Sequence, residues 1–168
     1  MQLQGHKSLN GYTLIEILVG LTIIGLLFAL SFASFRDFSR RQQLSGTAKK
    51  VQGDLRMTQG NAITGQKPDG VSCNAPNRLD SYSFNILTEN EYAVEANCVG
   101  SLTSAIEVKS VTLPPGITIS TPSPNPLKFK ILGQGTNVPT DSTWVITLSQ
   151  TGTLNTTSVT VTAAGEIR

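Results

Sequence analysis

Residues 11–35 read GYTLIEILVGLTIIGLLFALSFASF, and this stretch decides how the chain is organised. Glu16 is its only charged residue. A helix rises 1.5 Å per residue, so the 24 residues from 12 to 35 would extend about 36 Å, enough to cross a hydrocarbon core of about 30 Å. A cleaved signal peptide fits poorly, because the run is too long and no small-x-small site closes it. We expect a polar leader at 1–11 and a retained membrane-spanning helix at 12–35.

The helix is expected to continue as an amphipathic extension over residues 36–66. Apolar or small side chains recur there at spacings of four and three, which predicts one packing face, while Lys49, Lys50 and Asp54 are expected to face water. The packing positions are Leu44, Ala48, Val51, Leu55, Thr58 and Ala62. The Pro-Asp-Gly sequence that starts at Pro68 is expected to end the helix.

Residues 67–168 change to a period of two and predict a small extracytoplasmic β-rich domain. Runs rich in Thr, Val and Ile are separated by Pro, Gly and Asn turns, which favours strands. The expected strands are 82–87, 92–96, 106–113, 117–121, 127–132, 143–149 and 158–163, the first two forming a hairpin. A mostly antiparallel sheet packed on the helix would give both a core, so the fold class is α+β.

Cys73 and Cys98 both fall in the β-rich domain. An even count in an exported domain suggests a disulfide, and two unpaired thiols in a reducing compartment are the alternative. The charges disagree with export, since Arg36, Arg40 and Arg41 follow the apolar stretch and a positive-inside count would place the C-terminal part in the cytoplasm. The residues by themselves leave the orientation open.

Glu16 is a candidate functional residue because a carboxylate inside a membrane costs roughly 2.5–3.5 kcal/mol. Two milder interpretations remain. Thr13 and Glu16 fit an S/T-x-x-E capping box, in which Glu16 only satisfies the first helical turn. Alternatively, Glu16 lies at headgroup depth, where a charge costs little.

The sequence Gly-Tyr-Thr-Leu-Ile-Glu at 11–16, after a short basic leader, resembles the signature of type IV prepilins, in which Gly precedes Phe-Thr-Leu-x-Glu. Tyr12 stands where the family has Phe. The resemblance implies cleavage after Gly11 by a prepilin peptidase on the cytoplasmic side, N-methylation of Tyr12, and a C-terminal domain outside the membrane. It also implies that Glu16 pairs with the α-amine of a neighbouring subunit, and that the partners are other pilins or pseudopilins and an inner-membrane assembly platform.

Later segments of the chain are similar to the H-type pseudopilins of type II secretion and to FimT-type minor pilins. They are residues 55–66, 127–133 and 159–167. Ala33 stands where many major pilins have proline, which favours a minor or tip component. The resemblance implies a structural subunit of a type II secretion pseudopilus or a type IV pilus, held first in the bacterial inner membrane.

The alternative function is a minor pilin that binds DNA or a secreted substrate, for example in DNA uptake. Some FimT-type proteins bind DNA through a Gly-Arg-x-Arg tail. Here the tail is Gly165-Glu166-Ile167-Arg168, with an acid at one arginine position. The net charge is only +2, so nucleic acid is not an expected partner.

The residue inventory argues against an enzyme. His6 is the only histidine and belongs to the predicted leader, so a mature chain would lack a Ser-His or Cys-His pair and a histidine metal ligand. No Gly-Lys-Ser/Thr follows Gly133-x-Gly135, which predicts a turn, and Trp144 is expected in the core. We expect no cofactor or metal, because the acidic residues lack calcium-loop spacing and are expected at the solvated surface. They are Asp69, Asp80, Glu89, Glu91 and Glu95.

Overall fold

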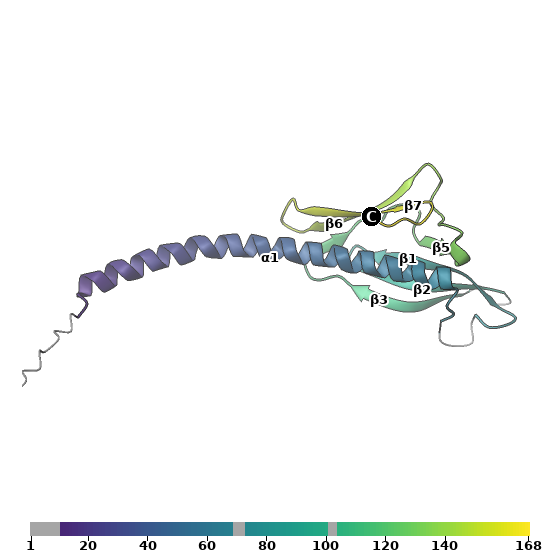
Figure 1. Cartoon of the computed structure of the whole chain (residues 1–168), viewed down its shortest axis with the longest axis horizontal. Helices are drawn as coiled ribbons and strands as arrows, with labels where there is room; N and C mark the ends of the chain where they lie inside the picture. The colour runs from purple at the N-terminus through teal and green to yellow at the C-terminus, as the bar shows by residue number, and fades with distance from the viewer. Residues whose placement is uncertain (1–10, 69–72, 101–103) are drawn as a thin grey trace, which may run out of the picture. The chain divides into compact units, whose positions relative to one another are not determined.

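The computed structural model describes residues 11–68, 73–100 and 104–168, without the side chains of residues 30–34 and 104. The predicted leader therefore lies outside the described residues, except for Gly11. The chain divides into two compact units, Met1–Ser39 and Arg40–Arg168. One helix, α1 (Leu14–Thr64), runs through both units, and all strands belong to the second unit (Figure 1).

The predicted packing face of α1 is confirmed. All six of its positions are buried, and Val51, Leu55, Thr58 and Ala62 are completely covered. The prediction that Asp54 faces water is wrong, because only 7% of this residue is exposed. Its side chain lies under the sheet because position 54 follows Val51 by three residues and so shares the inward face of the helix.

The helix ends at Thr64, two residues before the predicted bound at residue 66 and before the predicted Pro68 stop. Gly65 adopts a left-handed conformation with φ of 62°, its N–H donates to the Ala62 carbonyl, and the N–H of Gln66 donates to the Asn61 carbonyl. This is the Schellman arrangement, which satisfies carbonyls at a helix end with a glycine that has no Cβ to clash. The predicted stop extended to residues 69 and 70, which lie outside the described residues.

The seven expected strands are all present, but they form two antiparallel sheets rather than one. The first sheet has the order β3-β2-β1-β5, and the second has the order β4-β6-β7. The bounds are β1 (Arg78–Thr88), β2 (Glu91–Val99), β3 (Ser104–Thr112), β4 (Ile117–Ile119), β5 (Leu127–Lys130), β6 (Thr143–Gln150) and β7 (Thr156–Thr162). A short 3-10 helix, η1 (Ile131–Gly133), follows β5.

Prolines explain why the sheet divides. Five of them lie between residues 113 and 127, before and after the three-residue strand β4. A proline has no N–H to donate to a strand ladder, so one continuous sheet cannot run through this segment. The predicted hairpin of β1 and β2 is confirmed, with Phe84 opposite Val94 in the register.

Aromatic side chains join the two sheets in the core. Phe84 of β1 stacks on Tyr92 of β2 with ring centroids 4.6 Å apart, and its ring meets that of Trp144 of β6 edge-on at 6.1 Å. Trp144 is completely buried, as the sequence predicted, and its indole N–H donates to the Pro124 carbonyl at 2.8 Å. Within the second unit, α1 covers the inward face of the first sheet (Figure 1).

Candidate functional site

The sequence Gly-Tyr-Thr-Leu-Ile-Glu at residues 11–16 leads into the first turn of α1, which begins at Leu14. Thr13 immediately precedes the helix, and its hydroxyl accepts the backbone N–H of Glu16 at 3.3 Å. Glu16 is thus the third helical residue, where a carboxylate interacts favourably with the positive end of the helix. The capping interpretation of this pair therefore agrees with the geometry, but the bond uses the backbone of Glu16 and its side chain is exposed.

The first unit exposes a dense apolar surface. Its large apolar side chains between Tyr12 and Phe28 are 48–83% exposed. An apolar surface this continuous marks an interaction site, because single exposed apolar residues are ordinary but contiguous ones are not. Within the described part of the chain, no helix combines the length and the hydropathy of a membrane span. The predicted span at 12–35 includes the side chains of residues 30–34, which lie outside that part.

A buried polar cluster fixes α1 on the first sheet. The Asp54 carboxylate accepts the hydroxyl of Tyr92 at 2.8 Å and the ammonium of Lys109 at 2.7 Å. Tyr92 is on β2 and Lys109 on β3, so the cluster joins the helix to two strands. Burial, and secondly the hydrogen bond to the negative Asp54, raise the pKa of Tyr92. Sequence patterns missed this cluster, although an acid at an inward helical position was a signal that could have found it.

A disulfide closes the segment that follows the helix. Cys73 and Cys98 are bonded, with Cα atoms 5.3 Å apart, and both residues are almost completely buried. The bond attaches the chain beyond α1 to the end of β2. It therefore holds the far end of the β1–β2 hairpin near the end of the helix that the hairpin covers.

The acidic residues expected at a solvated surface do not all lie there. Glu95 is half-buried on β2, where it accepts hydrogen bonds from Ser83 at 3.3 Å and Asn85 at 3.1 Å. Glu91 is also half-buried, whereas Asp80 and Glu89 are exposed, and Asp69 lies outside the described residues. Residues 11–68, 73–100 and 104–168 contain no group of three or more side chains suited to hold a metal ion.

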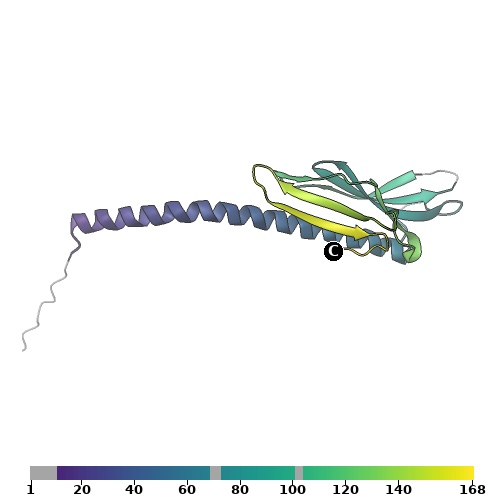
Figure 2. The same cartoon turned by 90° about the horizontal axis from the view of Figure 1, so that it is seen from above.

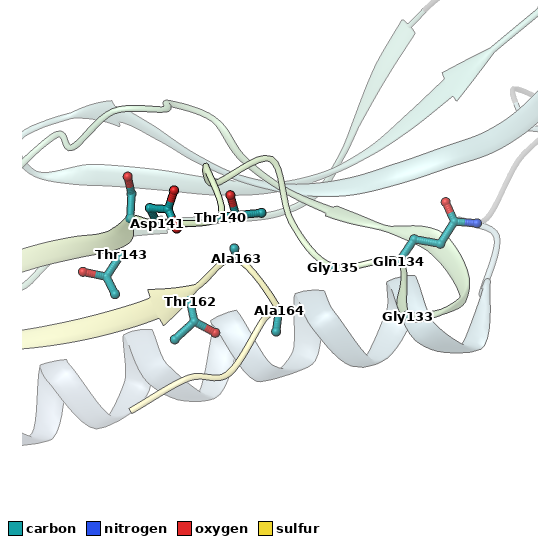
Figure 3. Close-up of a pocket in the computed structure, with 10 residues that line it drawn as sticks. Gly133, Gln134, Gly135, Thr140, Asp141, Thr143, Thr162, Ala163 and Ala164 are labelled. Carbon is teal, nitrogen blue, oxygen red and sulfur yellow. The ribbon is translucent and has the colours of Figure 1, made fainter.

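One pocket of the second unit lies between the loop after η1 and the end of β7 (Figure 3). Its volume is about 770 Å³, and its wall includes Gly133, Gly135 and Ala163. Both glycines have positive φ, which agrees with the predicted turn. Its polar side chains are hydroxyls, the amide of Gln134 and one carboxylate, Asp141. The residues that line this pocket include no histidine, cysteine or lysine.

The N-terminal segment matches a known sequence motif. Residues 7–32 match the family described as the prokaryotic N-terminal methylation motif. The matched segment includes Gly11, Tyr12 and Glu16, so the chain has a type IV prepilin-like N-terminus. No curated protein and no solved structure matches the chain. A motif of this kind is typical of structural, pilin-type subunits, and it leaves the β-rich unit unassigned.

Proposed function

We propose that this protein is a pilin-like structural subunit that is cleaved after Gly11, N-methylated at Tyr12 and packed into a filament through α1. The observation that carries the proposal is the match to the methylation motif over residues 7–32, at the head of a helix whose apolar side chains are exposed. Such a surface is stable only against lipid or other helices. Both environments are available to a subunit that moves from a membrane into a filament.

Packing within the described residues does not explain a glycine at position 11. A Cβ placed on it would meet no atom within 4 Å, so internal packing does not require glycine there. A peptidase that holds an extended chain against its own backbone does require a residue without a side chain. This supports Gly11 as the residue before the cleaved bond, with Tyr12 as the first residue of the mature protein.

Glu16 would complete the assembly contact. The carboxylate is exposed, while Thr13 already caps the backbone N–H of Glu16. An amine 4 Å from a carboxylate gains about 4 kcal/mol at an effective dielectric constant of 20. In a bundle of apolar helices, pairing with the α-amine of a neighbouring subunit would neutralise two charges that are otherwise costly and would fix the axial register.

The proposed location is the bacterial inner membrane, with residues 12–35 as the single-pass anchor and residues 67–168 on the extracytoplasmic side, before transfer to the filament. The bond between Cys73 and Cys98 supports this side, because structural disulfides persist in oxidising compartments. The similarity to H-type pseudopilins and FimT-type minor pilins, together with Ala33, supports a minor subunit of a secretion pseudopilus or a pilus. Its partners would be other such subunits, a prepilin peptidase with methyltransferase activity, and an assembly platform.

The test compares three variants of the full chain expressed in the host. Gly11→Val should accumulate uncleaved. Glu16→Leu should be cleaved and methylated normally, as mass spectrometry of the N-terminal peptide would show, yet should be missing from sheared filaments. Ile15→Leu is the matched control and should behave like the wild type. A mature N-terminus at Tyr12 in Gly11→Val, or normal incorporation of Glu16→Leu, would contradict the proposal.

A deletion in the host would assign the system. Secreted enzymes and surface pili should be quantified in parallel in the same strain. Loss of secretion with intact pili would indicate a pseudopilin, and loss of pili with intact secretion would indicate a minor pilin. If neither changes, the structural role is wrong.

A further inference from the structure

The turn between β6 and β7 exposes the most accessible apolar side chain of the second unit. Leu154 is 100% exposed, whereas the other exposed large apolar residues of the described second unit range from 37% to 71%. Residues 150–157 contain no charged side chain. One exposed leucine is ordinary on a protein surface, so this tip is a candidate contact only together with the groups that surround it.

The tip of this hairpin lies at one defined end of the second unit. Leu154 and Thr156 line a depression of about 340 Å³ together with Arg41 and Leu44 of α1. The second unit begins at Arg40. The tip is therefore at the end where the preceding segment of the chain joins the unit, and Figure 2 shows the hairpin running beside this part of α1.

The same end of the second unit is cationic. Arg40 and Arg41 are exposed, and residues 36–53 carry five basic side chains against one acidic side chain, Asp37. Asp54, the next acid along the helix, is buried and paired with Lys109. An exposed apolar tip beside exposed arginines has the chemistry of an interfacial membrane contact. In such a contact, apolar side chains enter the acyl boundary and cations attract anionic headgroups.

Chain length keeps this end close to the proposed anchor. Arg40 lies five positions after residue 35, which corresponds to about 8 Å along a helix and to at most about 18 Å in any conformation. If residues 12–35 span a bilayer, Arg40 must therefore lie near the headgroup layer, whatever the placement of the first unit. This step rests on the proposed function.

We propose that the β6–β7 tip and the adjacent arginines dock the second unit on an anionic phospholipid surface. Leu154 enters the boundary between headgroups and acyl chains, and Arg40 and Arg41 bind lipid phosphates. The contact holds the subunit at the membrane surface before assembly and breaks when the subunit enters a filament. Because the attraction involves exposed charges, it weakens as salt is added.

The experiment reconstitutes the full chain into vesicles of phosphatidylglycerol and phosphatidylcholine that contain lipids with brominated acyl chains, which quench tryptophan on contact. The native Trp144 is completely buried, so its fluorescence is the background against which an added tryptophan is measured. The reporter variant is Leu154→Trp. The matched control is Leu132→Trp, because Leu132 is also exposed but lies far from the arginines. Its neighbour Gly133 lines a pocket with Ile63. Ile63 is about 33 Å from Arg41 along the helix.

The expected result is about twofold quenching of the added fluorescence in Leu154→Trp and none in Leu132→Trp, since only the first probe reaches the acyl boundary. Quenching should disappear in vesicles of phosphatidylcholine alone and when Arg40→Gln and Arg41→Gln are added. Flotation of the vesicles reports separately whether the chain is inserted.

Each other outcome overturns the inference. An inserted Leu154→Trp chain without quenching refutes docking and leaves the proposed anchor intact. Equal quenching of both probes would mean that the unit lies on the bilayer without a defined contact. Protection of the Leu154→Trp probe from a water-soluble quencher, without quenching by brominated lipid, would assign the tip to a contact between copies. Failure of the chain to float with the vesicles would refute both the docking contact and the proposed anchor.

Discussion

Replacing Asp54 with alanine is expected to destabilise the β-rich unit, because Asp54 is the acceptor that joins α1 to two strands. The hydroxyl of Tyr92, a completely buried residue, would lose its acceptor, and a hydrogen bond to a charged group is worth about 1.5–3 kcal/mol. The ion pair with Lys109 adds less than about 1 kcal/mol, since the Lys109 side chain is 37% exposed and screened by water. Alanine recovers up to about 0.7 kcal/mol of helix propensity. The free energy of unfolding should therefore fall by about 2 kcal/mol.

Urea unfolding of the full chain in non-ionic detergent would measure this loss. Trp144 is the only tryptophan and lies in the core, so its fluorescence reports the unfolding of this unit. With an m-value of about 2 kcal/mol/M, the midpoint of Asp54→Ala should shift by about 1 M urea. Asp54→Asn keeps an acceptor for the Tyr92 hydroxyl and should lose about half as much.

Lys49→Ala is the matched control for Asp54→Ala. Lys49 is exposed on the same helix, and its replacement should change stability by less than about 0.5 kcal/mol. A double-mutant cycle with Tyr92→Phe should give a coupling of about 1 kcal/mol or more with Asp54→Ala. The reasoning is refuted if Asp54→Ala is as stable as Lys49→Ala, or if its cost is the same with and without the Tyr92 hydroxyl.

Three further predictions concern the same unit. Replacing Cys73 and Cys98 with serine should lower stability by about 3.5 kcal/mol, because the bond closes a loop with a sequence separation of 25, and reductant should then have no further effect in urea unfolding. The raised pKa of Tyr92 favours its neutral form, so its contribution is fully present below the ordinary value of 10.0 and is lost as the pH rises above it; thermal unfolding of Tyr92→Phe should show a shallower alkaline decline. Gly100→Ala should cost about 1–3 kcal/mol, measured by calorimetry, because the new Cβ would lie 2.7 Å from the Asn77 Cα, which is backbone and cannot rotate away.

The local features of this protein could be predicted from its sequence. The inward face of α1 is set by a spacing of three and four, and the seven strands are set by alternation between proline and glycine turns. The capping of the Glu16 N–H by Thr13 also depends on residues only three apart. The end of the helix was harder to predict from local sequence. Pro68 is the stronger helix-breaking residue, but the left-handed Gly65, three residues earlier, ends the helix.

The features that only the tertiary structure decided join residues far apart in the chain. Asp54 is buried because Tyr92 and Lys109 reach it from positions 38 and 55 residues away, and the period of the helix carries no information about either strand. The return of β5 to pair with β1, and the depression that Leu154 lines together with Arg41, also join residues far apart in the chain. The sequence by itself determined which segments are helix and strand and which residues form the N-terminal methylation motif, because those depend on neighbours in the chain. The structure alone decided which polar side chains are buried and which surfaces meet, because strand pairing and packing bring together segments that no local pattern links.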